Sequence, residues 1–187
     1  MNKIAVIFFL ILLALPVHAA RVDNIDGSLR HMQVLIPPQG GPLSLDLALS
    51  YDTRLAFEDG PLGLKWTHSY DIILHRNSDG TRIFIGGLGQ PHFFFSSTSG
   101  LKTSQGDHST IKHNEDDTWT VGLNNGKKYY FTSEGVLTKI GDHLGNWVTI
   151  DRTKPDVVTI TDPAKRKAVL HYTGKRIDWI QGPDNKV

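Results

Sequence analysis

Two histidines and a short acidic run are the side chains best suited to hold a metal ion or to move protons. His108 and His113 lie five residues apart, and the acidic run Glu115–Asp117 begins two residues after His113. Imidazole and carboxylate groups are common protein ligands of zinc, and paired acids can serve general acid–base catalysis. The neighbouring residues are polar and turn-forming, so we expect solvated histidines and an exposed acidic turn before Trp119. The sequence therefore predicts no metal site here.

Glycine-rich segments of the chain depart from the loops that bind calcium, phosphate or dinucleotides. Gly86–Gly89 begins like a calcium-binding β-roll repeat, but Pro91 stands where that repeat needs an aspartate, and no second copy follows. The same segment lacks the third glycine of a dinucleotide fingerprint. In Gly122–Lys127 the glycines are one residue too close for a phosphate loop, and Lys128 takes the place of its hydroxyl residue. We expect glycine turns at both places and no cofactor.

Catalytic motifs based on a nucleophile are absent from the sequence. The chain has no cysteine, which excludes disulfide bonds, a thiol nucleophile and a cysteine-type zinc site. It also lacks the Gly-x-Ser-x-Gly and His-Glu-x-x-His patterns. We therefore predict a protein that is not an enzyme. A glycosidase is the alternative, and it requires two carboxylates that converge on one cleft.

Aromatic residues are the other candidates for ligand contact: Trp66, Trp119, Trp147, Trp179, Phe93–Phe95 and Tyr129–Phe131. Exposed rings can stack on sugars, so a secreted carbohydrate-binding or adhesin-like β module is a second hypothesis. A β-protein of this size must also bury its large rings, and we expect packing to be their main role. Successive side chains of a strand face opposite sides, so at least one ring of Tyr129–Phe131 must point away from any one core face.

The elements that position these residues are predicted to be short antiparallel strands, which gives an all-β fold. Alternation over Leu43–Leu49 predicts a strand with one solvated face. Tyr70–Ile85 and Trp119–Thr132 each read as a hairpin, and Asn124–Gly126 supplies the favoured residues of a tight turn in the second. The polar segment Ser96–Gly106 is predicted to be an exposed loop.

A repeat of twenty residues occupies the last third of the chain. Ile140, Ile160 and Ile180 each end a strand pattern, and a four-residue turn and a second strand follow the first two. We predict that the three isoleucines take equivalent buried positions. A lone hairpin is marginally stable, so the units must stack edge to edge in one sheet. Arg176–Ile180 then forms an edge with unpaired backbone groups that nothing in the chain covers and that only Pro183 and Lys186 blunt.

These repeats resemble the YD repeats of RHS proteins. The similarity rests on Gly135–Asn146, Thr161–Arg166 and Leu170–Tyr172. Upstream, Leu49–Arg54 and Gly60–Tyr70 look like the N-terminal domain, of unknown function, that precedes such repeats. The chain departs from the repeat at two positions, Lys165 in place of the usual glycine and Gly182 in place of an aspartate.

The resemblance implies a structural role and not a catalytic one. RHS proteins wind YD repeats into a β-sheet shell around a hollow, which in many members holds a C-terminal toxin. It implies an N-terminal, antiparallel, sandwich-like β domain over residues 20–134 and stacked YD-type hairpins over residues 135–187, truncated within the third repeat. The expected function is that of a non-enzymatic, exported segment of a shell wall. The expected partners are further YD-repeat β segments, a second copy bound through the C-terminal edge, a toxin domain or a cell-surface glycan.

The first 19 residues read as a secretory signal peptide. Lys3 precedes the apolar run Ile4–Leu15, and Val17 and Ala19 are small residues at the cleavage-site positions. A run of that length is shorter than the roughly 20 residues that span a bilayer. Cleavage would remove one of the 20 basic residues and none of the 19 acidic ones. A balanced charge gives no reason to expect nucleic acid or a membrane as partner. The leader predicts a protein that is secreted, periplasmic or at the cell surface, and export of a chain without cysteine favours a bacterial source.

Overall fold

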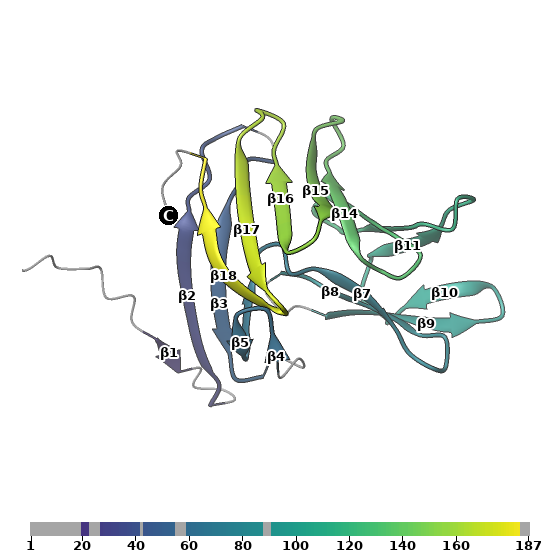
Figure 1. The fold of residues 1–187 in the computed structure, drawn as a ribbon. Coiled ribbons are helices and arrows are strands. Elements are labelled where there is room, and N and C mark those ends of the chain that lie inside the picture. Colours follow the sequence, from purple (N-terminus) through teal and green to yellow (C-terminus); the bar gives the residue numbers. More distant parts are fainter. Residues whose placement is uncertain (1–19, 23–26, 42, 55–58, 88–90, 184–187) are drawn as a thin grey trace, which may run out of the picture.

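The computed structural model describes residues 20–22, 27–41, 43–54, 59–87 and 91–183. Within these ranges the chain forms strands and no helix, and the paired strands are all antiparallel, so the predicted all-β class is confirmed. The predicted signal peptide and the residues after 183 lie outside the described residues. Figure 1 shows the strands arranged as separate sheets that pack on one another.

The N-terminal part of the chain forms two small sheets. The first has the order β1-β2-β3-β6, with β1 (Arg21–Val22), β2 (Leu29–Ile36), β3 (Leu47–Asp52) and β6 (Trp66–His68). A two-stranded ribbon of β4 (Asp59–Gly60) and β5 (Gly63–Leu64) stands beside it. The second sheet has the order β10-β9-β8-β7, with β7 (Ile73–Arg76), β8 (Arg82–Ile85), β9 (Pro91–Ser97) and β10 (Gly100–Thr103).

The remaining strands follow one another in chain order in a single eight-stranded sheet. They are β11 (Thr110–His113), β12 (Trp119–Gly122), β13 (Lys128–Phe131), β14 (Leu137–Gly141), β15 (Trp147–Lys154), β16 (Val157–Thr161), β17 (Lys167–Thr173) and β18 (Arg176–Gln181). β13 pairs with β14 across the predicted domain boundary at residues 134 and 135. The sheet of hairpins thus extends on both sides of that boundary, and the division into two domains stays a prediction.

One turn geometry recurs six times in the second sheet and the eight-stranded sheet. In each turn the amide of the first residue donates to the carbonyl of the fifth residue, and the fourth residue has a positive φ. This is the three-residue hairpin loop in which a type I turn is followed by a left-handed residue. The turns span residues 77–81, 114–118, 123–127, 132–136, 142–146 and 162–166. The repeat seen in the sequence after residue 135 therefore belongs to a longer structural series.

The repeat register holds for two of the three isoleucines. Ile140 pairs with Val148 and Ile160 pairs with Ala168, and both isoleucines are buried. Ile180 pairs with Leu170 but is only half-buried and packs at the margin of the core. Ile180 is less buried because its strand, β18, is the last of the sheet.

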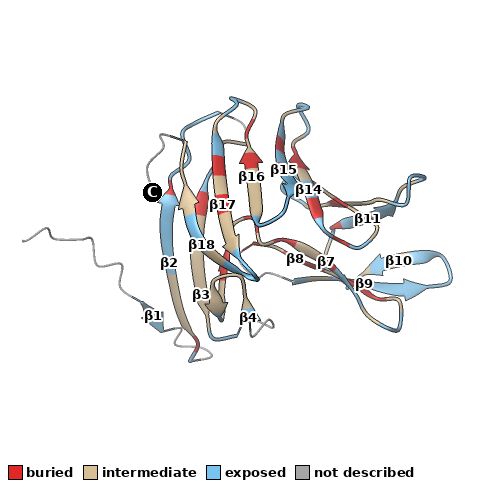
Figure 2. Ribbon diagram, viewed as in Figure 1, coloured by how far each residue is buried: buried red, intermediate tan, exposed pale blue. Residues whose placement is uncertain are grey.

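The core lies on the inner face of the eight-stranded sheet, which packs against the second sheet and against Ile36 and Leu47 of the first. The ring of Phe84 is 4.9 Å from that of Tyr129 and 6.1 Å from that of Phe131, both edge-on. Phe94 and Leu74 are fully buried beside them. Figure 2 shows the buried positions continuing along β14 to β17. Aromatic rings in these geometries add to the stability that burial provides.

The second sheet and the eight-stranded sheet also join through the turn at residues 132–136. The amide of Leu74 donates to the carbonyl of Gly135 at 3.0 Å, and Ile73 forms an isolated bridge with Val136. A Cβ on Gly135 would stand 2.0 Å from the carbonyl oxygen of Leu74. Only glycine fits there, since the position also has a φ of +85°.

Two predictions about local structure were wrong. The strand expected over Leu43–Leu49 begins only at Leu47, because Leu43 has a φ of 49° and the amide of Leu45 bonds to a side chain. The loop expected over Ser96–Gly106 instead contains the end of β9 and all of β10. Gly100 turns this hairpin with a φ of +103°.

Candidate functional site

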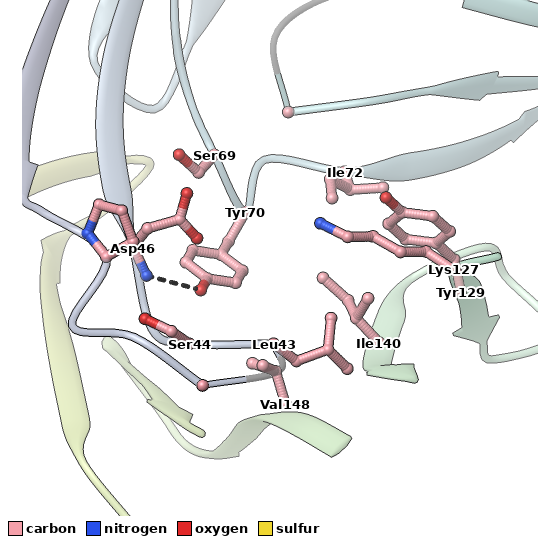
Figure 3. Close-up of a pocket in the computed structure, with 13 residues that line it drawn as sticks. Leu43, Ser44, Asp46, Ser69, Tyr70, Ile72, Lys127, Tyr129, Ile140 and Val148 are labelled. Atoms are coloured by element: carbon pink, nitrogen blue, oxygen red, sulfur yellow. Dashed lines mark hydrogen bonds between the residues drawn. The ribbon is translucent and has the colours of Figure 1, made fainter. Parts of the chain in front are cut away.

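A pocket of about 380 Å³ lies between the N-terminal segment that contains Leu43–Asp46 and the eight-stranded sheet. Figure 3 shows the side chains around it, which come from three regions. Leu43–Asp46 forms one wall, Ser69–Ile72 forms the second, and residues of β13 to β15 with Lys127 form the third. Pockets of this size can enclose a small molecule.

The wall formed by Leu43–Asp46 is fixed by the eight-stranded sheet. The amide of Leu45 donates to Oδ2 of Asp162 at 3.0 Å, and the side chain of Leu45 is fully buried. Asp162 is itself held by Arg166, whose Nε donates to Oδ2 at 2.7 Å. The pocket is therefore preformed by contacts that lie behind it.

Two tyrosines supply the buried polar groups of the pocket. Both residues are less than one-tenth exposed, and the hydroxyl of Tyr70 accepts a hydrogen bond of 3.4 Å from the amide of Asp46. The hydroxyl of Tyr129 has no hydrogen-bond partner among the described residues. Burial raises the pKa of each phenol, and the charge of Asp46 raises it further. Both phenols are therefore protonated at neutral pH and can donate to a ligand.

Opposite charges complete the pocket. Figure 3 shows the amine of Lys127 and the carboxylate of Asp46 on opposite sides of the Tyr70 ring. Asp46 is the only carboxylate among the described residues that line the pocket. The arrangement can bind a neutral polar molecule through donors and one acceptor. It does not hold the acid pair that a two-carboxylate glycosidase needs.

The residues considered for metal binding are placed apart from this pocket. Nε2 of His113 lies 2.6 Å from Oδ1 of Asp117, and His108 lies in the loop before β11. Glu115–Asp117 forms the exposed turn that the sequence predicts. Across the part of the chain that the structure describes, no group of three or more metal-ligating side chains comes together.

The glycine segments form turns where they are described. Gly122–Lys127 contains one of the six recurrent hairpin turns, as expected. A Cβ on Gly87 would stand 2.0 Å from the carbonyl oxygen of Ser69, so this glycine permits a close backbone approach. Leu88–Gln90 lies outside the described residues, and the β-roll motif is therefore covered only in part.

The aromatic residues divide between core and surface. Phe94, Tyr129 and Phe131 are buried. The remaining rings are half-buried or exposed: Trp66, Phe93, Phe95, Trp119, Tyr130, Trp147 and Trp179. Tyr130 and its neighbours thus lie on opposite faces of β13, as the alternation of a strand requires.

The outer face of the eight-stranded sheet carries a small aromatic cluster. The rings of Tyr130 and Trp147 meet at 5.3 Å, and the ammonium of Lys139 lies 4.6 and 4.2 Å from their respective centres. The Trp147 ring also covers Gly141, where a Cβ would stand 2.4 Å from it. These rings are engaged with protein groups, which limits the surface that they offer to a sugar.

The C-terminal edge is partly covered, contrary to the prediction that nothing in the chain covers it. The amide of Ile177 in β18 donates to the carbonyl of Pro61 at 2.8 Å, and Arg176 bonds to Gly60 and Asp59. Beyond these contacts a groove of about 470 Å³ runs between the end of β2 and β18. Its lining is mainly apolar, with Leu35, Ile36, Pro37, Leu62, Trp179 and Ile180 among the residues.

Comparison with known proteins does not assign this site. No model of a protein family matches the chain, and no curated protein matches it either. Among the residues that the structure describes, no helix is long and apolar enough to cross a membrane.

Several residues at these sites escaped the sequence analysis. Tyr70 sits in a predicted strand and shows no pattern of its own. Asp162 was read only as a turn residue, although its carboxylate also fixes Leu45. An aspartate in such a turn bonds to nearby backbone amides whether or not it also has a distant partner. No sequence signal therefore distinguishes Asp162 from an aspartate that acts only within its turn.

Proposed function

We propose that this chain is an exported, non-enzymatic structural segment that builds a β-sheet wall of the kind found in YD-repeat proteins. The observation that carries the proposal is the recurrence of one hairpin turn at six places, five of them joining consecutive strands of the eight-stranded sheet and one joining β7 to β8. Stacked hairpins with a common turn suit a sheet that grows by adding like units. The predicted leader over residues 1–19 would direct the protein out of the cytoplasm.

The C-terminal edge supports a role in assembly. β18 is an edge strand of the sheet, and the apolar groove lies along it. Edge strands attract further strands, because their backbone donors and acceptors need partners. The partner in this proposal is another β segment, supplied by a like repeat or by a second copy of the chain.

The edge proposal is tested by sedimentation and hydrogen exchange on residues 20–187. We expect self-association that rises with concentration, together with concentration-dependent protection of those β18 amides after Ile177 that face away from β17. Trp179→Lys should reduce association, because a charge on an edge opposes strand addition. Lys167→Gln, a change on β17 within the sheet, is the matched control. Strong protection of these outward-facing amides in a strictly monomeric sample would show that the edge is already covered, and the proposal would fail.

Export has its own test. We expect N-terminal sequencing of the protein recovered from outside the cytoplasm to begin at Ala20. Recovery of a chain that begins at Met1 would contradict cleavage of the leader.

A carbohydrate-binding module is the second candidate, and the pocket in Figure 3 favours it. Two protonated phenols, one ammonium and one carboxylate surround a half-apolar space, which is the mixture that a neutral sugar ring needs. A glycan array and titration of its hits provide the test. Tyr129→Phe, which removes one hydroxyl and keeps the ring, should weaken binding about tenfold. Binding that is insensitive to Tyr129→Phe and Lys127→Ala would exclude this pocket.

A further inference from the structure

Two arginines face each other across the hairpin of β7 and β8. Arg76 pairs directly with Arg82 in the register of the two strands. Directly opposed residues of an antiparallel pair point to the same side of the sheet, and like charges in this position repel. The side in question also carries Leu74 and Phe84, which are buried against the eight-stranded sheet. The two guanidinium groups therefore stand together at the rim of the core.

Arg82 is held rigidly at this rim. The residue is only 7% exposed, and the carbon of its guanidinium lies 4.0 Å from the centre of the Trp119 ring. The same ring stacks on His113 at a centre-to-centre distance of 4.2 Å. A guanidinium against a tryptophan ring is stabilised by a cation–π interaction that leaves its N–H groups free for other acceptors.

No carboxylate of the described residues forms an ion pair with either arginine. The guanidinium groups of Arg76 and Arg82 have no salt bridge or hydrogen bond to any residue in the described part of the chain. The carboxylate that acts on Arg82 is that of Asp117, which is highly exposed and bonded to His113. Burial lowers the pKa of Arg82, the charge of Arg76 lowers it further, and Asp117 opposes both. The pair thus keeps uncompensated positive charge at a partly dry position.

We propose that Arg76 and Arg82 form a binding site for a phosphate or sulfate group. A tetrahedral oxyanion presents several acceptors, and a guanidinium fork can bind two of them at once. Its negative charge would also remove the repulsion between the opposed arginines. Arg82 supplies the preorganised fork, Trp119 holds it in place, and Arg76 supplies the second, exposed charge.

The oxyanion can be a free ion or a substituent of a larger molecule such as a glycan. Titration calorimetry of residues 20–187 with inorganic phosphate, inorganic sulfate and a sulfated disaccharide separates these sources. Equal binding of ion and disaccharide indicates a site for the anion alone. Tighter binding of the disaccharide indicates a substituent with neighbouring contacts. Failure of all three probes to bind at millimolar concentration would overturn the proposal.

Variants locate the site. Arg76→Gln leaves an exposed position and should weaken binding about tenfold by removing one charge-assisted contact. Arg82→Lys keeps the charge but loses the fork, and it should weaken binding by at least as much. Asp117→Asn removes the opposing charge, tolerates the positive φ of that position, and should strengthen binding. Lys167→Gln removes one distant positive charge, and an equal loss in this control would reveal non-specific attraction and refute the site.

Discussion

The carboxylate of Asp162 accepts a hydrogen bond from the amide of Leu45, which precedes it by 117 residues. The same carboxylate accepts bonds from the amide and the guanidinium of Arg166, and it is almost fully buried. Burial alone would raise its pKa, but the bonds from Leu45 and Arg166 outweigh this effect and hold the pKa below its usual value. The turn at residues 162–166 thereby holds the N-terminal segment around Leu45 against the eight-stranded sheet.

Asp162→Asn should therefore destabilise the protein. The side-chain NH2 of asparagine would face the N–H donors of Leu45 and Arg166, and Arg166 would lose its counter-charge. Breaking a largely buried pair in this way lowers the free energy of unfolding by about 2–4 kcal/mol. Asp142→Asn is the matched control, because Asp142 occupies the same position of the preceding turn and bonds only within that turn. Chemical denaturation gives both free energies of unfolding. Equal losses in the two variants would refute a special role of the contact with Leu45.

His68 should make stability depend on pH. Burial, and secondarily the charge of Arg152, lowers the pKa of His68 from 6.5 to about 4. The unfolded chain therefore binds a proton at higher pH than the folded chain does. Stability is fully present above pH 6.5 and should decline by up to about 3 kcal/mol as the pH falls to 4. Denaturation at several pH values measures this slope.

His68→Asn is the control for that slope. Nδ1 of His68 accepts a hydrogen bond from the amide of Tyr70 at 3.2 Å, and an asparagine oxygen can take its place. The variant will lose some packing at every pH, but its stability should change less between pH 6.5 and 4. An unchanged slope would assign the pH dependence to other groups.

Lys165→Gly should stabilise the protein. Lys165 has a φ of 65° at the place where the preceding turn has Gly145. A side chain in the left-handed region costs about 1–2 kcal/mol, of which the greater flexibility of unfolded glycine returns a part. We expect a gain of about 0.5–1 kcal/mol. Gly145→Lys should cause a loss of similar size, since a Cβ there meets no atom within 4 Å. Changes of the same sign in both variants would contradict this explanation.

Ile160 and Ile180 are buried to different extents, so the same substitution at each should cost a different amount of stability. Ile160 is fully buried, so Ile160→Asp should cost more than about 2 kcal/mol by placing an unpaired charge in the core. Ile180→Asp should cost clearly less, because Ile180 is half-buried near the sheet edge. Thermal melting of the two variants tests the order. Unchanged melting of Ile160→Asp would refute the register.

Local chemistry explains which parts of the fold the sequence could predict. The hairpins around Asn124–Gly126 and Asp162–Arg166 were predicted because their turn residues bond within five positions. The strand β2 was missed, since its exposed residues Met32, Val34 and Leu35 lack a clear alternation. β2 pairs instead with β3, and that pairing joins residues between 11 and 22 positions apart, from Ile36–Leu47 to Arg30–Asp52.

The candidate sites depend on contacts of still longer range. Tyr70 and Tyr129 meet in one pocket only because separate elements pack together. The stacking of Arg82 on Trp119 joins two different sheets, and neither residue stands in a motif. The aspartates Asp142 and Asp162 look alike in sequence, and only the folded chain gives one of them a distant partner.

The recurrent turns have a consequence for the order of folding. Each turn closes a loop of only a few residues, so the entropy lost in forming it is small and a hairpin can form within microseconds. The bond between Leu45 and Asp162 closes a loop more than a hundred residues long, and its ends meet only after the intervening hairpins have shortened the path. We expect the hairpin series to form early and the N-terminal segment to dock late. Relative to Asp142→Asn, which breaks bonds within an early turn only, Asp162→Asn should then have a larger share of its effect on the rate of unfolding.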